Sequence, residues 1–293
     1  MLEFRALDIN DREKADAALR SSDFMGAEYT FANNLAWCRL ADTKVCFYKD
    51  FYILCAFGGQ GPSFVLPAGK GDLKDAIAEM KRFSESMGVP LVLAGVTKPS
   101  LEMLEEMYPD QFTAEFDRDS SDYIYLSSDL ISLAGRKFHG KRNHLARFKE
   151  LDYTYSPLTE KDFDDAILFC TDAYNGKTEA DHSAVAEQYA INTYFNYFDK
   201  LDLKGGIIRI GGETAAVTIG EGLNSNTFCV HIEKADTSYN GAYAGINNLF
   251  AESCMSEYKY VNREEDLGIE GLRKAKLSYN PVFLLEKYIV IFK

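Results

Sequence analysis

The sequence lacks any long hydrophobic run. A helix that crosses a bilayer needs about 18–20 consecutive apolar residues, and the longest apolar runs here, such as residues 289–292, are only as long as a strand. The N-terminal residues carry charges where a signal peptide needs an apolar segment. We therefore expect a cytoplasmic protein without stable membrane insertion.

Paired cysteines and clustered histidines are also missing. None of the six cysteines belongs to a Cys-x-x-Cys motif, and the four histidines are scattered at positions 139, 144, 182 and 231. Most of the cysteines lie among apolar residues, which is typical of small buried side chains in a reducing compartment. Because no spacing typical of a metal site appears, the sequence predicts no metal.

Positive charge is in short supply. The chain has 32 lysines and arginines against 45 aspartates and glutamates, a formal net charge of −13. Phosphate backbones and anionic membranes repel such a chain, which argues against general nucleic-acid binding. A local basic segment can still bind one anionic ligand, and the sequence contains one.

The chain is long enough for two domains. It has 293 residues, 46% of them hydrophobic, whereas a single core stops growing near about 250–300 residues. Strand-like segments alternate with helix-like segments and with hairpins, so the sheets should be mixed. We predict an α/β (α+β) fold of two domains, residues 1–125 and 126–293, each a mixed twisted sheet flanked by helices.

Several elements can be placed from the pattern. Apolar residues three and four apart predict a helix at 73–87. Residues 206–210, 213–221 and 227–233 are predicted to form a strand meander, followed by a helix at 243–257. We also predict a strand at 37–40 and two separate strands at 111–117 and 123–126.

A basic segment lies at residues 136–149. Six of its fourteen residues are Lys or Arg and none is acidic, which is unusual in so acidic a chain. It could clamp a phosphate or carboxylate, because guanidinium groups bind such anions with two hydrogen bonds. The alternative is a solvated basic face that pairs with acidic neighbours. The candidate anion-binding residues are Arg136, Lys141, Arg142 and Asn143.

Small and polar residues precede the helix predicted at 243–257. They allow the backbone to approach a ligand closely, and the unpaired amides and positive dipole of a helix start suit a phosphate. A strand, a glycine turn and a helix are also a common structural sequence, so the segment can be purely structural. The candidates are Ser238, Tyr239, Asn240, Gly241, Ala242, Tyr243 and Ala244.

A third segment, residues 262–279, concentrates polar groups where a predicted strand meets a helix. The carboxyl end of a strand is a favoured ligand position in α/β sheets. The alternative is an exposed loop followed by a helix with salt bridges at spacings of three and four. The candidates are Asn262, Asp266, Glu270, Arg273, Lys276 and Tyr279.

The run from Asn262 to Lys276 resembles the signature of the DUF2156 proteins, which are related to the C-terminal domain of phosphatidylglycerol lysyltransferases. Residues 31–37, 135–148 and 279–288 look like further blocks of that family. The resemblance implies two tandem GNAT-like folds. It also implies relatives that transfer an aminoacyl group from aminoacyl-tRNA or an acyl group from coenzyme A.

The resemblance also implies roles for two segments. In such folds the pyrophosphate of the donor rests on the loop before the third helix of the active half, which corresponds to residues 238–244. The usual Gln/Arg-x-x-Gly-x-Gly/Ala pattern is not met there, since Ser238 precedes Gly241 by three and Tyr243 follows it by two. A tyrosine near the last helix often protonates the leaving group, and Tyr279 is the matching position.

Together these observations favour a transferase that moves an acyl or aminoacyl group to an amine or hydroxyl acceptor. Asp266 or Glu270 would deprotonate the acceptor and Tyr279 would act as the general acid. Both acyl-CoA and aminoacyl-tRNA stay open as donors. The acidic chain slightly favours acyl-CoA, because a tRNA contacts a broad phosphate surface that such a chain repels, although a basic segment could bind a tRNA locally. One alternative is a non-catalytic module that binds anions or nucleotides on a degenerate transferase fold. Another is an N-terminal half that serves only oligomerisation.

Overall fold

The computed structural model describes residues 2–59, 61–172 and 182–293, and these form two compact units. Unit 1 comprises residues 1–122, 265–268 and 285–293, and unit 2 comprises residues 123–264 and 269–284. The sequence places one cut between residues 125 and 126. The structure divides the chain between Asp122 and Tyr123, and residues 265–268 and 285–293 also belong to unit 1. A single boundary does not describe this division.

Unit 1 is a mixed sheet with the strand order β1-β2-β3-β4-β6-β13-β7, to which β5 adds by pairing with β3. Strands β4 and β6 are parallel, whereas β1 to β4 are joined as antiparallel pairs. The strands are β1 (Arg5–Ala6), β2 (Thr43–Tyr48), β3 (Phe51–Ala56), β4 (Ser63–Val65), β5 (Ala68–Gly69), β6 (Val92–Thr97), β7 (Phe112–Leu126) and β13 (Phe283–Phe292). The helices are α1 (Arg12–Ser22), α2 (Phe31–Trp37), α3 (Leu73–Ser86) and α4 (Lys98–Met107).

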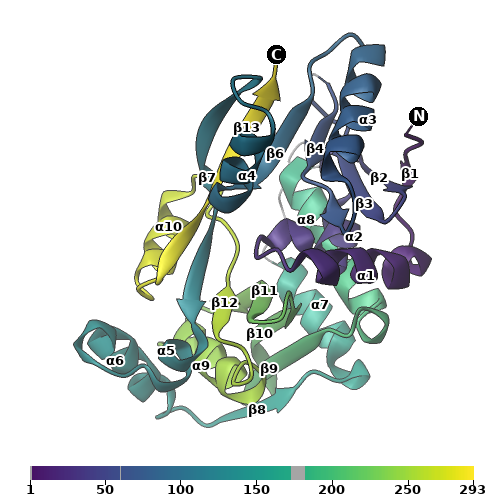
Figure 1. The fold of residues 1–293 in the computed structure, drawn as a ribbon. Coiled ribbons are helices and arrows are strands. Elements are labelled where there is room, and N and C mark those ends of the chain that lie inside the picture. Colours follow the sequence, from purple (N-terminus) through teal and green to yellow (C-terminus); the bar gives the residue numbers. More distant parts are fainter. Residues whose placement is uncertain (1, 60, 173–181) are drawn as a thin grey trace. The chain divides into compact units, whose positions relative to one another are not determined.

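The last strand of the chain completes the core of unit 1. Strand β13 lies between β6 and β7 in the sheet (Figure 1). Its residues Val290 and Phe292 pack with buried side chains from β3, β4, β6 and α3 in one hydrophobic cluster. The core of unit 1 therefore combines residues that are far apart in the sequence.

In unit 2 the order of the mixed sheet continues from the end of β7 through β12, β11, β10, β9 and β8. Strands β11 and β12 are parallel, and the other described pairs are antiparallel. The strands are β8 (Tyr153–Pro157), β9 (Lys204–Ile210), β10 (Glu213–Gly222), β11 (Thr227–Ala235) and β12 (Tyr260–Asn262). The helices are α5 (Ser127–Ser132), α6 (His139–Phe148), α7 (Phe163–Asp172), α8 (His182–Asn196), α9 (Ala242–Cys254) and α10 (Glu270–Leu277).

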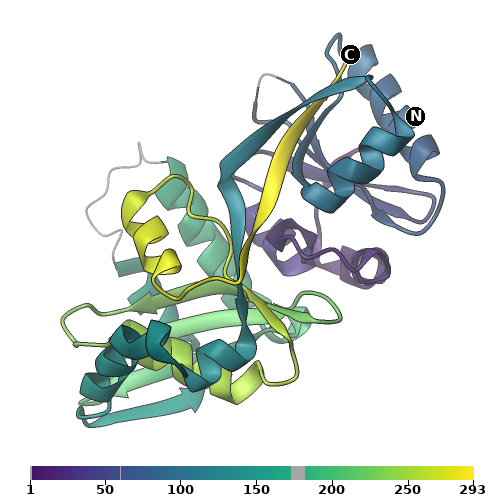
Figure 2. The ribbon, with the colours of Figure 1, turned by 60° about the vertical axis from the view of Figure 1, so that its left-hand side comes forward.

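Helix α9 is the central helix of unit 2. It contacts β9, β10 and β11, and α5 and α6 pack against it in turn (Figure 2). Strand β10, which α7 also contacts, is buried at six consecutive residues, 215–220. Since successive side chains of a strand point to opposite faces, both faces of this strand are covered.

Most of the predicted elements are present. The helix predicted at 73–87 is α3, the meander is β9 to β11, and the helix predicted at 243–257 is α9. The strand predicted at 37–40 is wrong, because Trp37 ends helix α2 and a turn follows it. The two strands predicted at 111–117 and 123–126 form one continuous strand, β7. In the part of the chain that the structure describes, none of the helices is long and apolar enough to cross a membrane.

Candidate functional site

The candidate site lies where the parallel strands β11 and β12 part. Their backbone pairing covers residues 227–229 of β11 and 260–262 of β12 and then stops, while β11 continues to Ala235. The carboxyl ends of parallel strands that diverge are favoured positions for ligands. Two side-chain pairs bridge the strands beyond this point, Glu233 with Arg263 and His231 with Glu264.

Two local features direct the side chains on these strands. The pairing of β10 with β11 shifts register so that His231 is the extra residue of a β-bulge, and bulges re-aim side chains next to functional sites. Just beyond the end of β12, Glu264 has a left-handed backbone with φ 55°. The side-chain oxygen of Asn262 accepts a hydrogen bond from the Glu264 amide at 2.7 Å, which stabilises this turn. Asn262, predicted to bind an anion, is buried and helps to position Arg263 and Glu264.

Arg263 and Glu233 form the centre of a first cluster. The guanidinium Nη2 lies 2.6 Å from a Glu233 oxygen, with side chains 11% and 9% exposed. Asn247 on α9 donates to the other Glu233 oxygen at 2.9 Å. Lys276 on α10 donates from Nζ to the backbone oxygen of Arg263 at 2.6 Å. Glu233 therefore holds the Arg263 side chain, Asn247 holds Glu233, and Lys276 holds the Arg263 backbone.

Tyr279 completes this cluster from the segment after α10. Its ring centre is 3.6 Å from Lys141 Nζ and 4.8 Å from the guanidinium carbon of Arg263, distances at which the face of an aromatic ring attracts a cation. Burial, reinforced by Glu233, raises the pKa of Tyr279, although Arg263 opposes the shift. The phenol therefore stays protonated near neutral pH and can donate a proton or a hydrogen bond.

Lys141 brings the basic segment to the same place. Burial and the nearby charge of Arg263 lower the pKa of Lys141 to about 8, and Glu233 opposes the change. A lysine with such a pKa exchanges its proton near neutral pH. Lys141 and Arg263 together also give the cluster more positive than negative side chains, since Glu233 is the carboxylate that pairs there.

Three polar atoms of this cluster are buried without a hydrogen-bond partner among the described residues. They are Tyr279 Oη, Arg263 Nη1 and Asn247 Oδ1. An unpaired buried polar group costs about 1–3 kcal/mol, so several such groups together call for a partner, such as an ordered water, an ion or a ligand, or for a catalytic role. The donors among these atoms suit a ligand with oxygen acceptors, such as a carbonyl or a phosphate.

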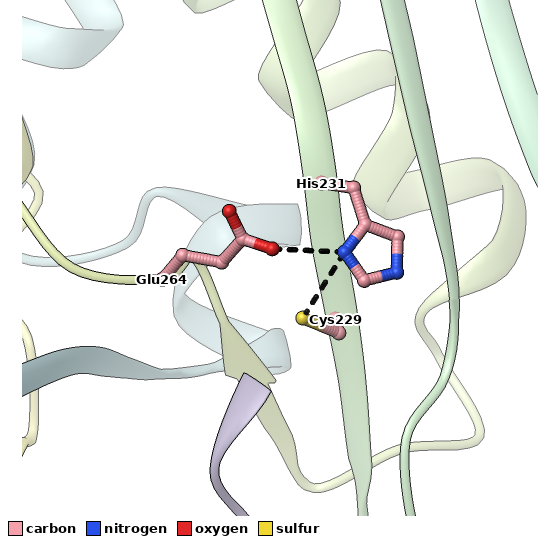
Figure 3. A group of neighbouring side chains, drawn as sticks. All are labelled: Cys229, His231 and Glu264. Carbon is pink, nitrogen blue, oxygen red and sulfur yellow. Dashed lines mark hydrogen bonds and ion pairs between the residues drawn. The ribbon is translucent and has the colours of Figure 1, made fainter. Parts of the chain in front are cut away.

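His231 is the centre of a second cluster (Figure 3). Its Nδ1 lies 2.8 Å from Glu264 Oε1 and 3.8 Å from Cys229 Sγ, and its Nε2 lies 3.0 Å from Glu221 Oε1. The ring of Tyr194 stacks on the imidazole with centroids 5.3 Å apart. Burial by itself lowers the pKa of His231, but Tyr194, Cys229 and hydrogen-bonded Glu221 more than offset it and raise the pKa well above its usual value.

The predicted phosphate loop packs against α6. Gly241 has φ 87°, and a Cβ there would lie 2.2 Å from the backbone oxygen of His144. The amide of Ser238 donates to the carboxylate of Asp236 at 2.8 Å. The amides of Tyr239, Ala242 and Gly245 also donate to backbone oxygens of this region. These residues fit a pyrophosphate poorly. Gly241 is needed for the close contact with α6, and the Ser238 amide already donates its hydrogen bond to Asp236.

The packing of the loop also sets how exposed its other predicted residues are. Asn240 and Tyr243 are exposed, whereas Ala242 and Ala244 are buried in the first turn of α9. The basic segment and the predicted loop are nevertheless neighbours, as the sequence hypothesis requires, since α6 and α9 contact each other.

Other predicted residues lie apart from the two clusters or have structural partners. Arg142 donates to the backbone oxygens of Leu133 and Gly135 at 2.5 and 2.7 Å. Asp266 belongs to unit 1, where it forms an ion pair with Arg118 at 3.2 Å. Exposed or half-buried positions are occupied by Arg136, Asn143, Glu270 and Arg273.

The structure thus gathers Tyr279, Lys141 and Lys276 around Arg263. The sequence interpretation did not select Arg263, Glu233 and Asn247, or the cluster around His231. One signal was available for the second cluster, because Cys229 and His231 are two apart on a predicted strand and so point to the same face.

Comparisons with known proteins agree with this architecture. A family model described as "Phosphatidylglycerol lysyltransferase, C-terminal" matches residues 20–291. A conserved protein of unknown function from Bacteroides thetaiotaomicron VPI-5482 is 38% identical, with each chain covered completely and a TM-score of 0.93. The C-terminal domain (DUF2156) of a putative lysylphosphatidylglycerol synthetase from Agrobacterium fabrum is 14% identical, with 96% of this chain and 91% of that chain covered and a TM-score of 0.66.

A curated relative is longer than this chain. An uncharacterized protein of Mycoplasmoides gallisepticum is 24% identical over 203 residues, which cover 67% of this chain and 63% of that protein. The structural likenesses confirm the predicted fold class, a mixed α/β architecture in which helices flank the sheet. They also confirm the predicted resemblance to DUF2156 proteins.

Proposed function

Because the chain belongs to the family of phosphatidylglycerol lysyltransferase C-terminal domains, we propose that unit 2 transfers an acyl or aminoacyl group to an amine or hydroxyl acceptor. The family and its structural neighbours share an acyltransferase-like or aminoacyltransferase-like fold. One observation supports placing the reaction at the Arg263 cluster. The unpaired Tyr279 Oη and Arg263 Nη1 are two buried donors beside the place where the parallel strands diverge.

The two donors suit the two charges that develop during acyl transfer. When the acceptor attacks the carbonyl carbon of the donor ester or thioester, negative charge forms on the carbonyl oxygen. Arg263 Nη1 can donate to that oxygen, and removal of one such donor costs about 10²–10³-fold in kcat. As the bond to the leaving oxygen or sulfur breaks, Tyr279 can supply the proton, a contribution of about 10²–10⁴-fold.

The acceptor must lose a proton, and the geometry favours Lys141 for this step. Its pKa of about 8 allows the neutral amine to take the proton near physiological pH, and it contacts the ring of Tyr279. Of the two carboxylates proposed from the sequence, Glu270 is exposed at the start of α10 and Asp266 is paired with Arg118. Lys141 is therefore the better base in this proposal.

The proposal includes two classes of donor, acyl-CoA and aminoacyl-tRNA. Coenzyme A gains little support from the loop 238–244, where Asp236 already accepts from the Ser238 amide, so no step is assigned to its pyrophosphate. An aminoacyl-tRNA would present its ester to the same donors, with contacts confined to the local basic segment. The cytoplasmic location expected from the sequence stays a prediction.

Donor binding and transfer test the proposal in separate arms. The purified protein would be mixed with radiolabelled acyl-CoA species in one arm and with aminoacyl-tRNAs in the other, each with amine, hydroxyl and phospholipid acceptors. We expect transfer from one donor class, and a loss of at least about 10²-fold in Arg263→Gln. If a folded protein binds neither donor, the proposal is wrong. Binding without turnover would instead support the non-catalytic anion-binding module.

A further inference from the structure

The cluster around His231 has the composition of a metal site. Cys229 Sγ, His231 Nδ1 and a Glu264 oxygen all lie within 4.8 Å of one another. Cys229 and His231 lie on β11, and Glu264 lies just beyond the end of β12 (Figure 3). We propose that these three side chains bind one divalent zinc ion. The function proposed for Arg263 and Tyr279 does not require this site.

The spacing of the three ligand atoms fits tetrahedral zinc. Zinc bonds of about 2.0–2.3 Å place neighbouring ligand atoms about 3.2–3.7 Å apart in a tetrahedron. The present distances from His231 Nδ1 are 2.8 Å to Glu264 and 3.8 Å to Cys229. Side-chain shifts of about 1 Å therefore suffice to bring all three atoms into the coordination sphere.

The surroundings of the imidazole match those of a zinc ligand. A metal-binding histidine usually donates its other ring N–H to a carboxylate, which fixes the tautomer and orients the ring. Glu221 lies 3.0 Å from His231 Nε2 and has this position. The stacked ring of Tyr194 further restricts the imidazole, so that Nδ1 faces Cys229 and Glu264.

Charge balance also suits a divalent ion. Glu221 and Glu264 place two carboxylates against the imidazole of His231, and Cys229 is buried beside it. Zinc binds a cysteine as the thiolate and a histidine through an unprotonated ring nitrogen. The positive charge of the ion would therefore lie next to the carboxylates and the thiolate of the same cluster.

The ligand set selects the kind of metal. A thiolate and an imidazole favour zinc over magnesium and calcium, which prefer oxygen ligands. Three protein ligands leave one tetrahedral position for water or for the second oxygen of Glu264. Cobalt(II) binds such sites in the same geometry and provides a spectroscopic probe.

The test is metal binding by the whole chain after treatment with a chelator. We expect about one zinc per chain by calorimetry, and a thiolate-to-cobalt charge-transfer band with cobalt(II). Cys229→Ser should lose that band, whereas Cys254→Ser, which alters a cysteine outside the cluster, should keep it. Glu221→Gln should weaken zinc binding about 10–100-fold. Tyr279→Phe should bind zinc like the wild type, which separates this site from the transfer reaction.

Two results would overturn the inference. One is a folded wild-type chain that binds neither zinc nor cobalt. The other is a Cys229→Ser variant that binds zinc as tightly as the wild type with an unchanged cobalt spectrum. If Cys229→Ser does not fold, the wild-type stoichiometry and the Glu221→Gln affinity decide the question, because Glu221 is not itself a proposed ligand.

Discussion

At the scale of single residues, burial changes what an ordinary side chain can do. Lys141 lies 3.6 Å from the centre of the Tyr279 ring and near the charge of Arg263. Burial disfavours the charged form of a lysine. The Tyr279 ring and Glu233 offset part of this cost for Lys141 but do not remove it. Lys141 therefore contacts the Tyr279 ring with a lowered pKa.

The lowered pKa of Lys141 predicts that ligand binding depends on pH. Because the pKa of Lys141 is lowered to about 8, the side chain loses its charge as the pH rises through that value, well below the 10.4 of a free lysine. We expect affinity for an anionic ligand to fall between pH 7 and about 9. Titration calorimetry across this range measures the effect.

Lys141→Arg is the matched control for this prediction, since an arginine stays charged in proteins. The variant should lose the fall in affinity between pH 7 and about 9. The effect on folding has the opposite sign. A lowered pKa in the folded state makes stability rise with pH between the folded and unfolded values. An affinity that stays constant up to pH 9 in the wild type would contradict the account.

The sequence identifies some of the site residues and misses others for a physical reason. Tyr279 and Lys141 stand out because polar or basic residues surround them in the chain. Arg263, Glu233 and His231 acquire their role through partners about thirty residues away on a neighbouring strand. Strand register decides such contacts, and a single sequence does not specify it.

At the scale of elements, the crossing of α6 and α9 explains the glycines of the predicted loop. A Cβ at Gly245 would lie 2.5 Å from the Phe148 ring, and one at Gly241 would lie 2.2 Å from the His144 oxygen. These two residues are four apart and so lie on one side of α9. The pattern that suggested a phosphate cradle is thus also what two closely packed helices require.

Gly241→Ala should destabilise the chain. The left-handed φ of 87° and the 2.2 Å approach to a backbone oxygen both oppose a Cβ, and strain of this kind costs on the order of 1–3 kcal/mol. Urea denaturation gives the free energy of unfolding. Gly140→Ala on α6 is the control, because a Cβ there meets nothing within 4 Å, and it should stabilise by up to about 1 kcal/mol. Equal stability of the two variants would contradict the packing described.

Elements with a strong internal pattern are predicted well, and those that depend on context are not. Helix α3 has an apolar stripe and a capping Asp72, and the sequence predicts it nearly to its ends. Residues 37–40 look like a strand because Trp37 and Leu40 are apolar, yet the side chain of Thr30 caps α2 and keeps Trp37 helical. Strand β7 has a polar middle, residues 117–122, which reads as a loop in the sequence.

At the scale of the whole molecule, unit 1 depends on a buried charge cluster that joins distant parts of the chain. Lys287 on β13 lies 2.8 Å from Asp122 on β7 and 2.7 Å from Glu28, and the side chains of Lys287 and Asp122 are 6% and 0% exposed. Burial lowers the pKa of Lys287, but Asp122 and Glu28 more than offset it and raise the pKa well above its usual value. The sequence does not reveal this cluster, because Glu28 and Lys287 are 259 positions apart.

Lys287→Met should therefore cause a large loss of stability. Removal of one partner leaves two carboxylates buried without their cation, at a cost of about 3–5 kcal/mol. Lys293→Met, at an exposed position, should change stability by no more than about 0.5 kcal/mol. Chemical denaturation followed by circular dichroism compares the two. A loss below about 1 kcal/mol in Lys287→Met would show that the cluster does not hold unit 1 together.

The transfer rate of Tyr279→Phe tests the central claim most directly. Single-turnover transfer from the donor that the wild type uses would be measured beside donor affinity and melting temperature, with exposed Tyr243→Phe as the control. We predict a rate at least about 10²-fold lower, unchanged affinity, and equal or higher stability, because the phenol oxygen has no hydrogen-bond partner among the described residues. A variant that transfers at the wild-type rate would contradict the assignment of Tyr279 as the proton donor in unit 2.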